Sequence, residues 1–336
     1  MRRLLACLIL ILIAAGSAFA TDPRLSAMGD VRIGVSGTNM QSYPNPASVF
    51  FGQSPFTFAV RGRVSDTLGV SSVPYLPNSD LNVLFVADLI TMGIDLSFES
   101  VNPTEKDDGH HVDMLQHTSL NVNLGAGYGF FSIGVGINGG SRRQRLDVPM
   151  SQVWDFPIQS VFAPFDRVVN SEFIQVDVGM MVKFGQFSVG LMLDDVLDNS
   201  GAGTSLTWMS LLSQTGVGVY WARQEYSSRG KANSFIYSFA FDANGTATEV
   251  YDEGNKRSLK FSFVFNGGAE LTYRMVRDSG MSLRFGYKAA SEELAKGIFT
   301  AGIGVSIRKL EFALNASIPN GGGDHVSFAA YMTVVF

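Results

Sequence analysis

Residues 281–288 read Met-Ser-Leu-Arg-Phe-Gly-Tyr-Lys, and this stretch decides the fold class. Large apolar side chains occupy every second position, and Ser, Arg, Gly and Lys lie between them. Successive side chains of a β-strand point to opposite faces, so the stretch predicts a strand with one apolar and one polar face. The same period of two recurs in 120–127, 174–184, 310–317 and 326–336, up to the last residue. The chain is therefore predicted to be all-β.

The length of these stretches points to a membrane. They run for about nine to twelve residues, whereas strands of soluble domains average five or six. A tilted strand needs about nine to eleven residues to cross a bilayer. A sheet in hydrocarbon must also close, because an open edge would leave N–H and C=O groups unpaired. The sequence therefore predicts an antiparallel, membrane-spanning β-barrel of the outer-membrane type.

The composition agrees with this fold and excludes several others. Of 336 residues only 16% are charged, against roughly 25% in an ordinary soluble domain. The 26 phenylalanines outnumber the 25 lysines and arginines, so there is too much apolar surface for intrinsic disorder. Beyond residue 20, no apolar run approaches the ~20 residues of a membrane-spanning helix. A net charge of −5 argues against nucleic acid as a partner.

Residues 1–20 have the pattern of a secretory signal peptide. Arg2 and Arg3 give a positive start, residues 4–15 are apolar, and Ala18-Phe19-Ala20 fits a cleavage site. Cleavage would remove Cys7, the only cysteine, so the mature chain would have neither disulfides nor thiolate metal sites. The alternative is an uncleaved anchor, for which the apolar run is short. We predict export with cleavage.

The strand count depends on residues 258–276. Asn266-Gly267 is a strong two-residue hairpin signal that would split the stretch into two strands. The hairpin would put Arg274 on the face of the phenylalanines, and an arginine in lipid costs about 2–4 kcal/mol near the midplane. Read as one long strand, the alternation is kept, and Gly267-Gly268 marks a bend or a bulge. This choice predicts fourteen strands, with short turns alternating with long connections such as 100–114, 140–170 and 243–257.

Residues 21–54 precede the first strand and do not alternate. They contain Ala27-Met28-Gly29 and Asn45-Pro46-Ala47, and the segment resembles the N-terminal plug of the FadL family of outer-membrane transporters. The C-terminal third, from residue 265 to Phe336, is similar to FadL-like and related PorV-like barrels. The resemblance implies a fourteen-stranded barrel formed by residues 55–336, with residues 21–54 as a small plug that carries the Asn-Pro-Ala motif.

Two groups of side chains are candidates for function in such a barrel. The polar strand faces put charges into the lumen, foremost Arg61, Lys183, Glu270, Arg274 and Arg284. Apolar residues of two predicted outer loops are candidates for ligand capture: Trp154, Phe156, Ile158, Phe162 and Phe165, and then Leu206, Trp208, Met209 and Leu211. The alternatives are that these charges form a paired polar lining that holds the plug and hydrates the interior, and that the two loops pack together as a cap.

Arg142-Arg143-Gln144-Arg145 is the chain's one basic block, and it is expected at the solvated base of a loop. A carboxylate head group or an anionic lipid is the alternative partner for these arginines. His110 and His111 lie in another predicted charged loop, without the spacing of a metal site. Neither a cofactor, a metal nor an enzymatic reaction is expected.

The resemblance implies passive uptake of long-chain fatty acids or similar hydrophobic molecules, released laterally through the wall into outer-membrane lipid. A charged lumen favours lateral release, because each CH₂ group exposed to water costs about 0.8 kcal/mol. The barrel-assembly machinery is expected to recognise the terminal Phe336. The alternatives are a non-transporting barrel, acting as a docking partner or surface antigen, and a general porin.

Overall fold

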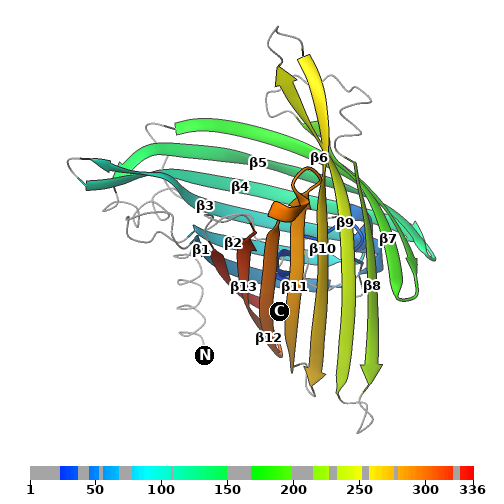
Figure 1. The fold of residues 1–336 in the computed structure, drawn as a ribbon. Helices are drawn as coiled ribbons and strands as arrows, with labels where there is room; N and C mark the ends of the chain where they lie inside the picture. The colour runs from blue at the N-terminus through cyan, green and yellow to red at the C-terminus, as the bar shows by residue number, and fades with distance from the viewer. Residues whose placement is uncertain are drawn as a thin grey trace.

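The computed structural model describes residues 23–36, 45–52, 56–67, 78–106, 109–149, 168–198, 215–226, 233–251, 257–275, 279–320 and 326–336. Within them, fourteen antiparallel strands pair in sequence order, and β1 pairs with β14, so the sheet closes into a barrel (Figure 1). The predicted fold class and strand count are confirmed.

The strands are β1 (Phe56–Thr67), β2 (Asn78–Ala87), β3 (Ile90–Lys106), β4 (Gly109–Tyr128), β5 (Phe131–Pro149), β6 (Val168–Phe184), β7 (Phe187–Asp198), β8 (Thr215–Tyr226), β9 (Ser234–Tyr251), β10 (Arg257–Met275), β11 (Ser279–Ala290), β12 (Ile298–Ile307), β13 (Leu310–Pro319) and β14 (Ser327–Val335). The helices are α2 (Pro23–Ala27), η1 (Pro46–Phe51) and η3 (Leu294–Lys296). Among the described residues, no helix has both the length and the apolar character needed to span a membrane.

The period of two in the sequence separates the two faces of the wall. In β11, Met281, Leu283 and Phe285 are 55%, 47% and 61% exposed. Ser282 and Arg284, between them, are buried. The apolar side chains therefore point outward, and the small and charged ones point into the barrel. This explains how so hydrophobic a chain lacks a long apolar segment.

β10 settles the ambiguity at Asn266-Gly267. It is one strand, and its pairing with β9 and β11 continues through these residues without a register shift. The single-strand prediction is confirmed. Of the bend or bulge predicted at Gly267-Gly268, the bulge is wrong. Gly268 instead gives room to another part of the chain, since a Cβ there would lie 2.3 Å from the carbonyl oxygen of Met28.

Several strands extend beyond the predicted ends. β3 runs to Lys106 and β4 starts at Gly109, so the predicted connection 100–114 is almost entirely strand. In the predicted connections 140–170 and 243–257, the described residues, which are 140–149, 168–170, 243–251 and 257, are all strand. The β3–β4 and β9–β10 pairs project past the rest of the wall (Figure 1). Paired backbone groups are satisfied without an apolar face, so the ladder continues where the alternation stops.

Two charged motifs assigned to loops lie in these extensions, which corrects the prediction for both. The Arg142-Arg143-Gln144-Arg145 block belongs to β5. His110 and His111 belong to β4, and His111 is buried with its Nδ1 2.9 Å from Oδ1 of Asp147. The register between β4 and β5 shifts here, and Asp147 has a φ of 60°. This arrangement is typical of a β-bulge.

Candidate functional site: the inner wall and the segment that lines it

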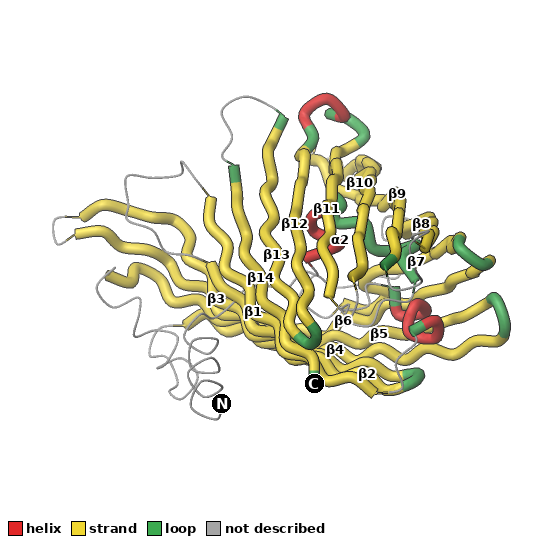
Figure 2. The backbone as a smooth tube through the Cα atoms, turned by 90° about the horizontal axis from the view of Figure 1, so that it is seen from below, coloured by secondary structure: helices red, strands yellow, loops and turns green. Residues whose placement is uncertain are grey.

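Residues 23–36 and 45–52, here called the inner segment, lie against the inner face of the wall. Their contacts follow the wall in reverse strand order. α2 contacts β13, β12 and β11, the following residues contact β9, β8 and β7, and η1 contacts β6, β5 and β4 (Figure 2). Val49 then packs with side chains of β1 and β2. The described part of the inner segment therefore runs along the wall before the chain enters β1.

Inward-facing glycines let the backbone of the inner segment approach the wall. A Cβ at Gly134 would lie 2.3 Å from the carbonyl carbon of Pro46, and one at Gly190 would lie 2.0 Å from the carbonyl oxygen of Ile33. The Cβ atoms of real side chains essentially never come closer than 3.0 Å to a non-bonded atom elsewhere in the chain. Similarly close backbone approaches occur at Gly218, Gly268 and Gly286. Glycine at these positions is therefore required for the backbone contact.

Polar side chains of the wall satisfy the carbonyl groups of the inner segment. The donors are Asn315 to Pro23 (2.8 Å), Thr300 to Ala27 (2.9 Å), Ser188 to Gly34 (2.7 Å) and Ser132 to Ala47 (2.9 Å). They come from four strands spread around the barrel. Buried carbonyl groups need such partners, because an unpaired one costs about as much as a lost hydrogen bond. The wall therefore holds the inner segment at many points.

Asn45 of the Asn-Pro-Ala motif is fully buried and uses both ends of its amide. Its Oδ1 accepts a hydrogen bond from the backbone N–H of Ala47 at 3.0 Å, which caps η1. Its Nδ2 donates to the carbonyl oxygen of Ile33 at 2.9 Å, and lies 3.4 Å from those of Met180 and Leu191. Pro46 occupies the first helical position, where its missing N–H is harmless. Asn45 thus joins both parts of the inner segment to β6 and β7.

Asp242 of β9 holds the turn in the middle of the inner segment. Its fully buried carboxylate accepts hydrogen bonds from the backbone N–H groups of Arg32, Ile33 (2.9 Å) and Gly34 (3.4 Å). Successive N–H groups aimed at one anion form a nest, which stabilises a buried negative charge. The Arg32 side chain also pairs with Asp194 of β7.

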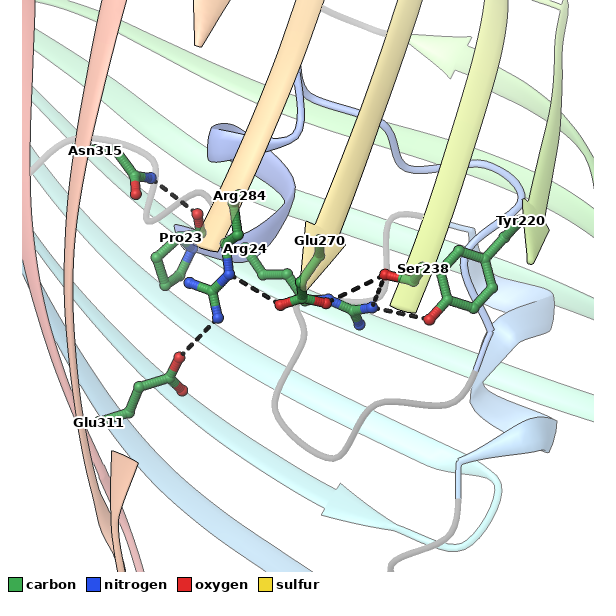
Figure 3. Close-up of polar contacts among 8 residues, drawn as sticks. All are labelled: Pro23, Arg24, Tyr220, Ser238, Glu270, Arg284, Glu311 and Asn315. Carbon is green, nitrogen blue, oxygen red and sulfur yellow. Dashed lines mark hydrogen bonds and ion pairs between the residues drawn. The ribbon is translucent and has the colours of Figure 1, made fainter. Parts of the chain in front are cut away.

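A cluster of four charged residues anchors α2 (Figure 3). Glu270 of β10 lies between Arg24 of α2, at 2.6 Å, and Arg284 of β11, at 2.9 Å. Arg284 also reaches Glu311 of β13 at 3.3 Å. The Arg24 guanidinium donates to the hydroxyl group of Tyr220 at 2.8 Å. Buried charges persist only when paired and hydrogen-bonded, and two arginines balance two glutamates here.

The structure brings Glu270 and Arg284 together, while the other predicted lining residues lie elsewhere. Arg61 is buried on β1, and its Nε donates to the hydroxyl group of Thr333 at 3.3 Å. The Lys183 ammonium group lies 5.6 Å from the ring centroid of Phe51 in η1. Arg274 is exposed, on the same face of β10 as Glu270 and near the end of the strand.

The inner wall from β2 to β6 carries a second polar network. Asp95 accepts hydrogen bonds from Asn82 at 2.5 Å and from Asn121 at 3.1 Å. Two further pairs are Asn123 with Thr91, and Asn138 with Gln175, each at 3.2 Å. No group of three or more His, Cys, Asp or Glu residues in the described part of the chain is placed to hold a metal ion.

The nine predicted capture residues lie outside the described residues, between 150 and 167 or between 199 and 214: Trp154, Phe156, Ile158, Phe162, Phe165, Leu206, Trp208, Met209 and Leu211. The signal-peptide residues 1–20 lie outside them as well. The role of these loops and the domain boundaries at 21–54 and 55–336 stay predictions.

The sequence analysis missed Asp242, Arg24 and Asn315 as residues that hold the inner segment. Asp242 left a signal, because it is the one charged side chain on the inward face of the predicted strand 233–242. Arg24 and Asn315 left none, since their partners lie 246 and 292 residues away.

Neither a known family model nor a curated protein sequence matches the chain. Solved structures do match. The CymD monoaromatic hydrocarbon channel is 10% identical, with a TM-score of 0.55, over 96% of this chain and 98% of that one. The Pseudomonas putida toluene transporter TodX is 13% identical, with a TM-score of 0.52, over 96% of this chain and 99% of that one.

The chain has the fold of these channels. A Pseudomonas aeruginosa FadL homologue is 10% identical, with a TM-score of 0.46, over 96% of this chain and 98% of that one. The predicted FadL-like barrel is confirmed at the level of the fold by the likeness to CymD and TodX. The kinship with PorV-like barrels stays a prediction.

Proposed function

We propose that this chain is a passive outer-membrane channel for hydrophobic small molecules, with long-chain fatty acids or similar compounds as cargo. The observation that carries the proposal is the inner segment, which contacts the wall from β4 to β13 and whose backbone fits against wall glycines from β4 to β11. A general porin needs an open, water-filled lumen. A lumen lined around its circumference by a fixed segment favours a selective channel instead, as does the fold shared with two hydrocarbon channels.

The polarity of the wall supports lateral release. Asp95, Asn82 and Asn121 form a hydrogen-bonded patch on the inner face, and Arg61 lies nearby on β1. Moving a hydrocarbon chain along such a surface would cost about 0.8 kcal/mol for each CH₂ group that meets water. An exit through the wall into lipid avoids this cost. Capture belongs, in this proposal, to the apolar loops that contain Trp154 and Trp208.

The seam between β7 and β8 is the place in the described wall that best suits such an exit. Only seven residue pairs join these two strands, fewer than join any other neighbouring pair in the described residues. The described ladder ends at Leu193–Thr215, where the described part of β8 begins. The register between β6 and β7 also shifts between Val176 and Val178 of β6. As a result, β7 has extra residues at this point. Within the described ladders, fewer hydrogen bonds would have to break to part the wall here than at any other seam.

Uptake by intact cells tests the proposal. The chain is expressed in a Gram-negative host that lacks its own fatty-acid channel, and entry of labelled oleate is measured. The double variant Leu193→Cys with Thr215→Cys ties the seam by a disulfide on oxidation, and the mature chain is predicted to have no other cysteine. Ile303→Cys with Leu314→Cys places the same cross-link on the outward face between β12 and β13, as a matched control.

Saturable uptake that falls on oxidation of the seam pair, is restored by reduction, and is unchanged by the control pair supports the channel and its lateral exit. Uptake that survives the seam cross-link would overturn the exit but leave the channel intact. Failure of the purified barrel to bind oleate, together with steady ion conductance in planar bilayers, would overturn the channel in favour of a porin. Loss of both activities would indicate a docking barrel.

A further inference from the structure

The basic block of β5 divides between the two faces of the wall. Arg142 points into the barrel, since its guanidinium lies 5.1 Å from the ring centroid of Phe173, which is buried on the inner face. Arg143 and Arg145 alternate with Arg142, and the β5–β6 register is regular from Phe131 to Arg145. They therefore lie on the outward face, in line with the exposed side chain of Ile137.

Arg143 and Arg145 lie at the end of the uncharged, mostly apolar stretch of outward-facing side chains on β5. The outward positions of β5 from Phe131 to Ser141 carry no charge. Ten residues of strand span about 33 Å, or about 25 Å along the membrane normal at a tilt near 40°. That is the height of the apolar band of an outer-membrane barrel. The aromatic side chains of Phe130 and Phe131 mark the other border, next to the short β4–β5 turn.

Among the described residues, no acidic side chain forms an ion pair with either arginine. Cross-strand register puts Gln116 and Asn170 beside Arg143. Met114 and Val168 lie beside Arg145 in the same way. The one outward carboxylate in the adjoining row of β6 is Glu172, paired in register with Ser141.

We propose that Arg143 and Arg145 bind the phosphate groups of a phosphorylated lipid in the outer leaflet. This rests on the proposed location in the outer membrane, but not on the cargo or its exit. A guanidinium group binds a phosphate through two parallel hydrogen bonds. Two arginines that lie two residues apart on a strand point to the same face, so their guanidinium groups can bind neighbouring phosphate groups. Basic side chains at the edge of an apolar band are the usual recognition elements for anionic lipids.

Native mass spectrometry of the full-length mature barrel in non-ionic detergent tests this. The probe is purified lipid A with its phosphate groups, and lipid A with the phosphates removed is the matched lipid control. The variant is Arg143→Gln with Arg145→Gln. Arg142→Gln, on the same strand but facing the lumen, controls for loss of a positive charge. Glu172→Gln removes the nearby negative charge and should change affinity in the opposite direction.

The expected result is binding of lipid A at least about tenfold weaker in the double variant, as loss of charge-assisted hydrogen bonds requires. Arg142→Gln should bind like the unmodified barrel, and Glu172→Gln more tightly. Equal binding of the dephosphorylated lipid, an unchanged double variant, or an equal loss in Arg142→Gln would each overturn the proposal. Oleate uptake in the double variant should stay normal, which separates this site from the proposed transport.

Discussion

Replacing Asn45 by Ala should release the inner segment from the wall without unfolding the barrel. The change removes the cap of η1, worth about 0.5–2 kcal/mol. It also leaves the buried carbonyl oxygen of Ile33 without its donor at 2.9 Å, which costs about 1–3 kcal/mol. The two losses together come to about 1.5–5 kcal/mol of local stability. The strands beside the site, β6 and β7, keep their own ladder hydrogen bonds.

Hydrogen–deuterium exchange measured by mass spectrometry on the folded barrel in detergent checks this. Because each 1.4 kcal/mol is a factor of ten, amides of residues 47–52 should exchange roughly 10- to 4,000-fold faster. Asn45→Asp should be at least as disruptive, since its carboxylate would face the carbonyl oxygens that Nδ2 now contacts. Asn320→Ala, which breaks one exposed 2.8 Å bond to Ala295, is the control. Unchanged exchange of residues 47–52 in a folded Asn45→Ala barrel would refute the reasoning.

Other changes have equally definite outcomes. Glu270→Gln should lower the thermal midpoint of the folded barrel by several degrees, because it leaves two buried arginines short of charge, whereas Glu311→Gln, which removes one partly exposed contact, should have a smaller effect. Equal midpoints for the two variants would contradict this. Gly134→Ala should prevent correct folding, since its Cβ would lie 2.3 Å from Pro46, while Gly139→Ala on the same strand, with 3.9 Å of room, should fold normally as judged by heat-modifiable gel mobility. Phe336→Ala should reduce the amount assembled in cells but not refolding in detergent, where only its ring contact with Phe58 is lost; equal loss in both settings would argue against recognition by the assembly machinery.

The sequence was sufficient to predict the wall. Its period of two predicted which side chains of β11 point outward and which point inward. The cost of placing a charge in lipid predicted that β10 is one strand through Asn266-Gly267. The extents of β3, β4 and β5 were not predictable in the same way. Beyond the bilayer, both faces meet polar surroundings, so pairing there is maintained by backbone hydrogen bonds that leave no pattern in the side chains.

The candidate site was predictable only in its residue types. Asn45 was singled out by its motif, yet its partners at Ile33, Met180 and Leu191 depend on how the closed barrel folds around the segment. The excess of glycine was visible, but a glycine gives no indication of which backbone will pack against it. Asp242 contacts residues more than 200 positions earlier in the chain, a pairing that no local pattern contains.

The path of the inner segment has a consequence for how the protein is made. Residues 23–52 are synthesised before any strand, yet they bind side chains as distant as Asn315, 292 residues later. Contacts of such sequence separation form late, because the loop they close carries a large entropic cost. The earliest part of the chain therefore finds its last partner only when β13 is in place. Seating of α2 between Glu270 and Asn315 would thus report that the strands have all been added in the right order.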